Sequence, residues 1–310
     1  MTTVSVVIPA FNAAPWIREA IDSALAQTMV PLEVIVVDDG STDETATLLA
    51  TYGTRIRIVT QTNKGVAAAR NAGIDAFCGD WIAFLDADDV WDRRKLELQL
   101  QALQTDLSIG LLGTATFAWP ESQPSAPSRG VHEMAPLACI TRDALAVKNY
   151  LTTSSTLVRH DVVKSVGAFD TALCGPEDHD YWLRCADVTR VAVLRVPLTG
   201  YRSVSGSLSR RAPAMEAGMR RILHKLDACD FWRGQRLLRR HAYSYVSYSC
   251  AHLHGTGGHQ LLAIRWLLAS VLWYPFPYTR TEANVPFARA RRLAVLLLRL
   301  LGLRRPDPGY

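Results

Sequence analysis

The stretch WIAFLDADD, residues 81–89, places an apolar run directly before a cluster of acids. Trp81 to Leu85 has the length and composition of a buried strand. Asp86 and Asp88 follow where this strand ends, and an open α/β sheet binds its ligands at the carboxyl ends of its strands. Two carboxylates held one residue apart can share a hard divalent cation with a substrate diphosphate. A solvated turn is the alternative interpretation of the same pattern.

Three further apolar runs of strand length precede this one, and amphipathic segments of helical length separate the four. Valine and isoleucine dominate the runs, which favours strands. Strands and helices that alternate with short links predict βαβ units and a parallel sheet covered on both faces. This architecture is typical of nucleotide binding. The expected strands are residues 4–9, 32–38, 55–60 and 81–86, and the expected helices are residues 14–26, 43–51, 65–78 and 93–105.

The pattern becomes less regular after residue 105 and changes character again after residue 208. Residues 109–119 favour a long strand, and the Pro/Ser-rich PESQPSAPSRG, residues 120–130, favours a loop. Residues 176–186 then predict a helix, and residues 190–201 one or two strands. Helical patterns alone follow. We therefore expect an α/β body that ends near residue 208 and an α-helical C-terminal region over residues 209–310.

The composition is that of a globular protein. The 310 residues suffice for one large domain or two smaller ones. A hydrophobic content of 49% with 20% charged residues argues against disorder. The six cysteines show no CxxC spacing, as expected of reduced thiols. Because the N-terminus MTTVSVVIPAFN also lacks the basic and apolar regions of a signal peptide, we expect a cytoplasmic location.

Polar residues follow the first two strands at the expected carboxyl edge of the sheet. The first strand ends in Pro9 and Ala10, with Asn12 in the loop after it, and the backbone of this loop can face a ligand. After the second strand, Asp38 and Asp39 reach the same edge, where a carboxylate can accept hydrogen bonds from a ribose or a nucleobase. Capping of the next helix is the alternative role for this segment.

Positive charge follows the third strand. Lys64 and Arg70 lie in TNKGVAAARNAGI, residues 62–74, where Gly65 and the run of alanines permit close helix packing. Their charges suit the diphosphate of a nucleotide. A place on the solvated surface of an amphipathic helix is the alternative for Arg70.

Six segments in this order resemble glycosyltransferase family 2, whose catalytic domain has the GT-A fold. Four are SVVIPAFN, VVDDGSTDET, NKGVAAARNAGI and WIAFLDADD; GAFDTALCGPEDHDYWLRCA is similar to the family's GxFDxxxxxxED segment, and YRSVSGSLS to its YRxxxxSxS pattern. The resemblance covers about residues 3–209. It implies an α/β, Rossmann-like nucleotide-diphospho-sugar transferase domain with a mostly parallel central sheet over residues 1–208, divided into a nucleotide-binding half (1–105) and an acceptor half (106–208).

The resemblance also implies roles at the matching positions. Asp88 would bind the Mn²⁺ or Mg²⁺ that bridges the donor phosphates, and Asp86 would face the ribose and the diphosphate. Asp39 would lie toward the base. The residues expected to bind the nucleotide sugar are Pro9, Ala10, Asn12, Asp38, Asp39, Lys64, Arg70, Asp86 and Ala87.

The general base implied by the resemblance is Asp178, which lies in the acidic run Glu177 to Asp180. Carboxylates are favoured at a helix N-terminus in any case, so helix stability alone can explain one or two of them. Glu177 and Asp180 remain the alternative bases. We expect Glu177, Asp180 and Arg202 to support the site.

The implied activity is the transfer of a single sugar, with inversion at the anomeric carbon, from a UDP-, dTDP- or GDP-type donor to a hydroxyl of a glycan or lipid-linked acceptor. Cell-surface polysaccharide biosynthesis is the expected context. The QxxRW motif of processive synthases is missing from the sequence, which argues against repeated addition. A non-catalytic protein that binds nucleotide sugars or glycans and a nucleotidyltransferase are the alternatives.

The C-terminal region is strongly basic. From Arg202 onward the chain has 18 basic and five acidic residues, net +13, whereas the preceding part carries net −8. Two leucine-rich segments, residues 261–274 and 293–303, are shorter than the roughly 20 residues of a spanning helix. We expect peripheral docking on the anionic inner face of the plasma membrane first, and a protein or homodimer interface second. Nucleic acid ranks last and is not expected as a partner.

Overall fold

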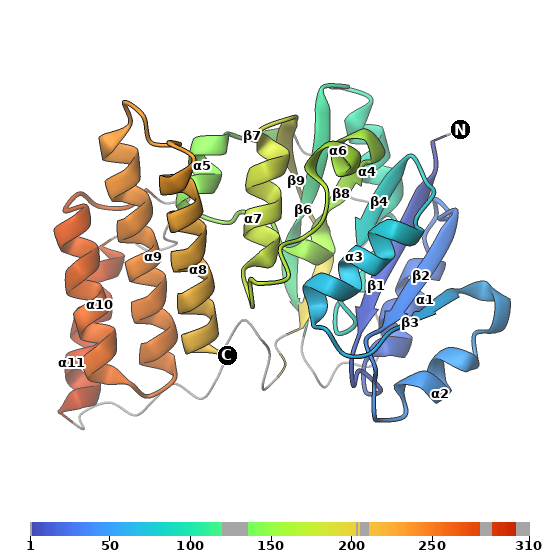
Figure 1. Cartoon of the computed structure of the whole chain (residues 1–310), viewed down its shortest axis with the longest axis horizontal. Coiled ribbons are helices and arrows are strands. Elements are labelled where there is room, and N and C mark those ends of the chain that lie inside the picture. Colours follow the sequence, from blue (N-terminus) through green and yellow to red (C-terminus); the bar gives the residue numbers. More distant parts are fainter. Residues whose placement is uncertain (1, 120–135, 203, 205–210, 280–286, 302–310) are drawn as a thin grey trace. The chain divides into compact units, whose positions relative to one another are not determined.

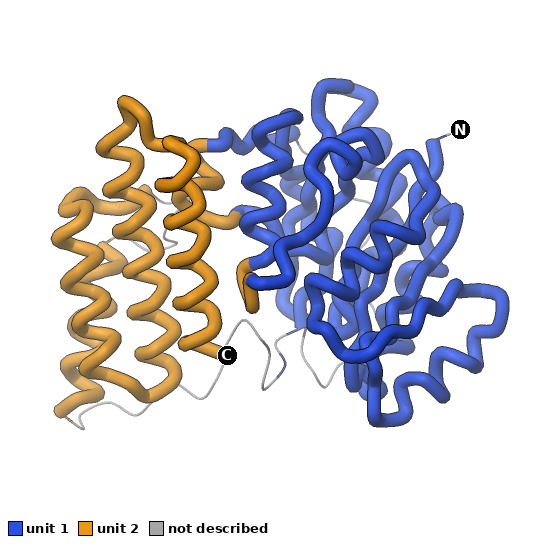
Figure 2. Tube along the Cα trace, in the orientation of Figure 1, with its two compact units in different colours: residues 1–142, 150–172, 177–204 blue, residues 143–149, 173–176, 205–310 orange. Residues whose placement is uncertain are grey.

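The computed structural model describes residues 2–119, 136–202, 204, 211–279 and 287–301. The chain divides into two compact units, shown in different colours in Figure 2. Unit 1 comprises residues 1–142, 150–172 and 177–204, and unit 2 comprises residues 143–149, 173–176 and 205–310. The expected loop at residues 120–130 and most of the YRSVSGSLS segment lie outside the described residues.

Four parallel strands form the first half of the sheet in unit 1, in the order β3-β2-β1-β4. All seven residues of β1 are buried, which is why its sequence is a continuous apolar run rather than an alternating one. Helices α1 and α3 pack against β1 (Figure 1). The bounds are β1 Val4–Ala10, α1 Ile17–Leu25, β2 Glu33–Asp38, α2 Thr45–Ala50, η1 Gly53–Arg55, β3 Arg57–Thr60, α3 Val66–Ala76 and β4 Trp81–Phe84.

The second half of the sheet mixes strand directions. Strand β8 joins β4 antiparallel, β6 joins β8 antiparallel, and β9 then runs parallel to β6. Strands β5 and β7 pair antiparallel with β9. The bounds are β5 Val90–Trp91, α4 Lys95–Leu103, β6 Ile109–Trp119, β7 Leu137–Ile140, η2 Thr153–Ser155, β8 Leu157–Arg159, α6 His160–Val166, α7 Glu177–Ala186 and β9 Arg190–Arg202. The predicted α/β fold is confirmed.

Close packing of α3 on β1 explains the small residues of the third motif. A Cβ atom built on Gly73 would lie 2.3 Å from Cγ1 of Val7, a separation that no side chain tolerates. Gly73, rather than the predicted Gly65, therefore lets the helix backbone approach the strand. Gly65, just before the helix, has φ +88°, in the left-handed region that favours glycine.

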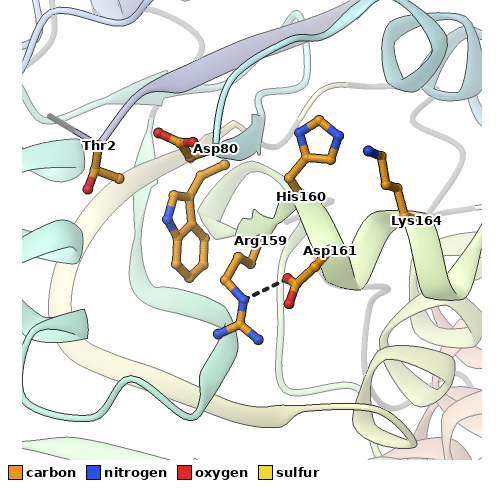
Figure 3. Close-up of a pocket in the computed structure, with 7 residues that line it drawn as sticks. Thr2, Asp80, Arg159, His160, Asp161 and Lys164 are labelled. Carbon is orange, nitrogen blue, oxygen red and sulfur yellow. Dashed lines mark hydrogen bonds and ion pairs between the residues drawn. The ribbon is translucent and has the colours of Figure 1, made fainter.

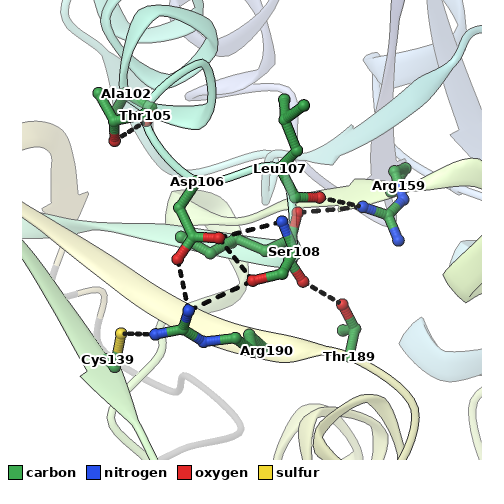
Figure 4. Close-up of polar contacts among 10 residues, drawn as sticks. Ala102, Thr105, Asp106, Leu107, Ser108, Cys139, Arg159, Thr189 and Arg190 are labelled. Atoms are coloured by element: carbon green, nitrogen blue, oxygen red, sulfur yellow. Dashed lines mark hydrogen bonds and ion pairs between the residues drawn. The ribbon is translucent and has the colours of Figure 1, made fainter.

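Polar contacts tie the connection between α4 and β6 to the start of β9 (Figure 4). The carboxylate of Asp106 accepts the backbone N–H of Ser108 at 3.0 Å and an Arg190 N–H at 2.6 Å. Arg190 also donates to the thiol of Cys139 on β7 at 2.9 Å. The guanidinium of Arg159 donates to the Leu107 carbonyl at 3.1 Å. These bonds hold the segment before β6 against β8 and β9, and they join β9 to β7.

Helices make up the described part of unit 2. Alanines and leucines of α9, α10 and α11 form its buried cluster, namely Ala251, Ala263, Leu267 and Leu296. Among the described residues, no helix is both long and apolar enough to cross a bilayer. The bounds are α5 Arg142–Val147, whose first residue belongs to unit 1, α8 Ala212–Ala228, α9 Arg236–Thr256, α10 Gln260–Trp273 and α11 Ala288–Leu300.

Candidate active site

The acidic loop after β4 is held by hydrogen bonds within unit 1. The backbone N–H of Asp89 donates to the Asp86 carbonyl at 3.1 Å, which closes a tight turn. The hydroxyl of Ser154 accepts the backbone N–H of Asp86 at 3.0 Å and donates to the Asp89 carboxylate at 2.5 Å. One buried serine therefore fixes both ends of the turn that carries Asp88.

Arg202, at the end of β9, secures the same turn from another direction. Its backbone N–H donates to Asp89 at 2.9 Å, and its Nε donates to the Asp88 carbonyl at 2.8 Å. Its Nη2 forms an ion pair with Glu19 of α1 at 2.6 Å, and its side chain is only 1% exposed. Arg202 thus organises the acidic loop, the kind of supporting role that the sequence predicted.

Negative charge accumulates in this turn. Burial, followed by the charge of Asp86, raises the pKa of the half-buried Asp88 to about 6. Burial, followed by the charges of Asp88 and Asp86, raises the pKa of Asp89 well above its ordinary value. Because Asp89 is 1% exposed and engaged by Ser154 and Arg202, it is a structural acid. Asp88 is only half-buried, and a nearby positive charge would stabilise its charged form.

Arg70 is buried in unit 1 and bridges two acids from distant parts of the sequence. Its Nη2 lies 2.7 Å from Asp86 Oδ1, and its Nη1 lies 2.6 Å from Glu177 Oε1. Burial alone would lower the pKa of Arg70, but the charges of Asp86 and Glu177 outweigh burial and raise it. The arginine predicted to bind a diphosphate is therefore an internal bridge between the acidic loop and α7, rather than a solvated surface residue.

The acids at the start of α7 have different surroundings. Glu177 is 4% exposed and paired with Arg70, and Asp180 is 5% exposed and paired with Arg184 at 3.0 Å. Asp178 is half-buried and accepts the hydroxyl of Thr153 at 3.3 Å. Burial and ion pairing thus give Glu177 and Asp180 structural roles, whereas the Asp178 carboxylate retains access to solvent.

The short helix η2 links the two groups of acids. Thr153 contacts Asp178, and the next residue, Ser154, contacts Asp86 and Asp89. Trp91 also donates its indole N–H to the Ser154 carbonyl at 2.7 Å. Sequence reasoning missed Thr153, Ser154 and Asp89. The run TTSST, residues 152–156, is the signal that points to them, because consecutive buried hydroxyl residues need polar partners.

The loops after β1 and β2 are joined by side-chain hydrogen bonds. Asn12 has φ 48° and accepts the Thr42 backbone N–H at 2.8 Å, while its own backbone N–H donates to the Ser41 hydroxyl at 3.0 Å. Asp38 accepts the Ser41 backbone N–H at 2.9 Å. Pro9 and Ala10 are buried in β1, and the open side chain of this loop is Phe11, 48% exposed.

Asp39 holds the loop that follows β3. Its carboxylate accepts the Gln61 side chain at 2.6 Å and the backbone N–H groups of Lys64 and Gly65 at 2.9 and 2.8 Å. The side chain of Lys64 is exposed and makes no ion pair among the described residues. Asp39 therefore shapes the carboxyl edge of the sheet, and Lys64 is an exposed cation in the loop that it holds.

A separate hollow of about 670 Å³ lies at the opposite, amino-terminal edge of β1 and β4. Its lining mixes charges and includes Asp80, His160, Lys164 and Arg159, which is paired with Asp161 at 2.6 Å (Figure 3). This hollow is distinct from the acidic loop, which emerges from the carboxyl end of β4. An α/β sheet binds ligands at the carboxyl edge, so the acidic loop is the candidate active site.

Comparison with known proteins found a family match, similar curated proteins and similar solved structures. Residues 5–138 match the model described as glycosyl transferase family 2. An uncharacterized glycosyltransferase of Rickettsia prowazekii is 30% identical over 200 residues, which cover 61% of this chain and 60% of that protein. Chondroitin synthase of Escherichia coli is 39% identical over 114 residues, which cover 36% of this chain and 17% of that protein. The chain thus matches about 60% or less of the length of these relatives.

Solved structures share the fold across nearly the whole chain. TarS 1-349 of S. aureus has a TM-score of 0.60 at 20% identity and covers 97% of this chain and 92% of its own. Mannosyltransferase PcManGT from Pyrobaculum calidifontis, solved with GDP-Man and Mn²⁺, has a TM-score of 0.58 at 18% identity, with coverages of 97% and 88%. At these identities the likeness establishes the fold alone.

The mixed α/β sheet of unit 1 has the GT-A fold that these solved structures share. The family match over residues 5–138 and the curated relatives support a family 2 glycosyltransferase. This finding agrees with the resemblance drawn from the ordered sequence motifs.

Proposed function

We propose that unit 1 transfers a single sugar from a nucleotide diphosphate sugar to an acceptor hydroxyl, with Asp178 as general base. One observation carries this proposal. Arg70 and the Thr153–Ser154 pair connect the start of α7 to the Asp86–Asp89 turn at two separate points. A base and a donor-binding loop that are rigidly joined can hold acceptor and donor in line for reaction.

The donor side is supported by the acids and loops of the carboxyl edge. Asp86 keeps one carboxylate oxygen engaged with Arg70, and its side chain is 28% exposed, so it can accept a hydroxyl of the donor. Lys64 supplies an exposed positive charge for phosphate. Pro9, Ala10, Asn12, Asp38 and Asp39 would form the wall behind the nucleoside, largely through backbone groups and fixed loops.

A divalent cation fits the surroundings of Asp88. Burial, followed by the neighbouring charge of Asp86, raises the pKa of Asp88 to about 6. Two carboxylates this close favour a hard cation that neutralises them. The described residues offer no group of three or more potential metal-ligating side chains. Asp88 would thus bind Mn²⁺ or Mg²⁺ together with the phosphates of the donor. When bound, the ion would stabilise the charge of the departing nucleoside diphosphate.

Asp178 is the acid best placed to accept a proton. Glu177 and Asp180 are buried in ion pairs, so their carboxylates are committed to Arg70 and Arg184. Asp178 is more exposed, and the hydroxyl of Thr153 orients one of its oxygens. Deprotonation of the acceptor hydroxyl by Asp178 would allow direct attack on the anomeric carbon from the face opposite the leaving group. Such a single displacement inverts the configuration.

The acceptor class is inferred from relatives. Chondroitin synthase is a polysaccharide-forming protein by name, and its matching segment covers 36% of this chain. We infer a glycan or lipid-linked acceptor in polysaccharide biosynthesis. The UDP-GlcNAc and GDP-Man ligands of the solved structures make UDP and GDP sugars the first donors to test.

The decisive experiment is a screen of UDP, dTDP and GDP sugars with Mn²⁺ or Mg²⁺, in which release of nucleoside diphosphate is measured. Asp178→Asn should lower the rate of transfer and hydrolysis by about 10²-fold or more while donor binding persists. Asp88→Asn should abolish the metal dependence of donor binding. Asp75→Asn, an exposed acid on α3, is the matched control and should behave as wild type.

Other outcomes separate the alternatives. Donor binding without release of any product would indicate a non-catalytic binding protein, and release of pyrophosphate would indicate a nucleotidyltransferase. An unimpaired Asp178→Asn variant would refute the assignment of the base. Proton NMR of the first-formed product reports its anomeric configuration, and retention would refute the single displacement.

A further inference from the structure

We propose that the solvent-facing sides of α10 and α11 in unit 2 together form a docking surface for an anionic lipid bilayer. This α10–α11 face comprises the exposed apolar side chains Leu261, Leu268 and Leu272 of α10, and Phe287, Leu298 and Leu301 at and around α11. It lies outside unit 1, so the inference stands apart from the transferase chemistry.

The exposed leucines of α10 form a stripe. Leu261, Leu268 and Leu272 are spaced seven and four residues apart, which places them on one side of the helix. They are 71%, 52% and 78% exposed. The buried residues Ala263 and Leu267 occupy the opposite side, against α9 and α11. Helix α10 is therefore apolar on its solvent side as well as on its core side.

Helix α11 repeats this arrangement. Leu296 is fully buried in the core of unit 2, whereas Phe287, Leu298 and Leu301 are 76%, 40% and 69% exposed. The exposed residues recur at intervals of 11 and three, on the side of the helix away from Leu296. Isolated apolar residues on a protein surface are ordinary, but two helices with apolar solvent-facing stripes indicate an interaction surface.

The charges beside these stripes have one sign. Helices α10 and α11 contain five arginines and no acid. Arg289 donates to the Tyr274 carbonyl at 2.5 Å and Arg299 to the Gly255 carbonyl at 3.3 Å, so these two serve the fold. The side chains of three further arginines, Arg265, Arg291 and Arg292, make no hydrogen bond or ion pair among the described residues. Leucines flanked by uncommitted arginines match the apolar and anionic layers of a lipid surface.

Charge complementarity favours a bilayer over a second copy of the chain. In a twofold-symmetric dimer the same face meets itself, so Arg265 and Arg291 would approach the same residues of the other copy with no acid between them. Such like-charge contact is unfavourable. Phosphate headgroups would instead pair with the arginines while the leucines enter the acyl boundary.

The dimensions fit a helix lying in the interface. The 14 residues of α10 extend about 21 Å at the rise of an α-helix, less than the roughly 30 Å of a bilayer core. Arg265, in the middle of the helix, would lie at the headgroup level only if the helix is parallel to the membrane surface.

Vesicle flotation of the full chain tests the proposal. We expect retention on vesicles of phosphatidylcholine with 30% phosphatidylglycerol at low salt, about a tenth of physiological ionic strength. At high salt, where charges are screened, we expect release. Vesicles of phosphatidylcholine alone should bind more weakly. Failure of the wild-type chain to bind the anionic vesicles at low salt would overturn the proposal.

Paired variants locate the surface. Leu272→Asp should weaken binding about ten-fold or more, because it removes an apolar anchor and adds repulsion. The matched control is Leu237→Asp on α9, which changes a leucine that is 59% exposed elsewhere in unit 2 and should bind as wild type. Arg265→Gln with Arg291→Gln should weaken binding about 30-fold at low salt. Circular dichroism confirms that each variant is folded.

Two results would overturn the assignment of this face. Equal loss in Leu237→Asp and Leu272→Asp would mean that negative charge anywhere weakens binding. A dimer of the wild-type chain that Leu272→Asp converts to a monomer, measured by light scattering without lipid, would assign the face to a second copy.

Discussion

Replacement of Arg70 by methionine tests the bridge that joins the two halves of the site. The side chain of Arg70 is 4% exposed and lies 2.7 Å from Asp86 and 2.6 Å from Glu177. Methionine has nearly the same length and keeps the apolar contact with Phe169, over whose ring the guanidinium lies at 5.6 Å. The substitution therefore removes the positive charge and leaves most of the packing in place.

The magnitude follows from the burial of the two acids. Removal of one partner from a buried ion pair costs about 3–5 kcal/mol, because the other charge stays desolvated. Glu177, with a side chain 5% exposed, meets this condition, whereas Asp86, at 28%, is partly screened by water. We therefore expect Arg70→Met to lower the free energy of unfolding by about 3 kcal/mol, the lower end of that range.

The loss should depend on pH with a definite sign. Without the guanidinium, burial raises the folded-state pKa of Glu177 above its unfolded value, so the folded variant binds a proton that the unfolded chain does not. Stability of the variant then falls as pH rises from about 4.3 through the raised pKa. The free-energy difference from wild type should be smallest near pH 5 and largest near pH 7.

Urea unfolding followed by circular dichroism at pH 5, 6 and 7 measures these quantities. The matched control is Arg57→Met, which removes a side chain 56% exposed whose nearest acid, Glu33, is 3.8 Å away. We expect this control to change stability by less than about 1 kcal/mol. If Arg70→Met and Arg57→Met lose the same stability, or if the loss does not vary with pH, the reasoning about a buried bridge is refuted.

Three further perturbations test other parts of unit 1. Thr153→Ala should raise the pKa on the acidic limb of the kcat/KM profile, because the hydroxyl stabilises the charged form of Asp178, and Thr153→Ser should restore the profile; an unchanged profile contradicts this role. Burial lowers the pKa of Lys95 well below its ordinary value. Above that folded-state pKa the unfolded chain binds a proton that the folded protein does not. The free energy of unfolding of wild type should therefore rise relative to that of Lys95→Met by about 1.4 kcal/mol per pH unit up to about pH 10. If urea unfolding at pH 8, 9 and 10 gives the same difference between the two proteins, the buried lysine is not neutral. Gly73→Ala places a methyl group 2.3 Å from Val7 and should cost about 1–3 kcal/mol in urea unfolding, more than the helix-propensity gain of about 1 kcal/mol; a stabilised variant excludes the tight contact.

Local sequence patterns suffice to predict the parallel half of the sheet. The runs before Asn12, Asp39 and Asp86 are mostly apolar and show no alternation of apolar and polar residues, so burial on both faces and the βαβ order follow from hydrophobic patterning. The placement of these residues near the carboxyl edge follows from the same geometry. The irregular half was harder to predict, since antiparallel joining of β8 to β4 depends on contacts that no local pattern encodes.

The sequence by itself determined the alternation of strands and helices in the first half of unit 1, the family resemblance and the candidate acids at the strand ends, because strand burial and turn chemistry are local properties. Only the tertiary structure decided which acids are structural and which remain open. Arg70 meets Glu177 across 107 positions and Arg202 meets Asp89 across 113. These long-range pairs bury Glu177 and Asp89, whereas Asp178 and Asp88 are only half-buried, since desolvation and pairing depend on the environment that the whole fold creates.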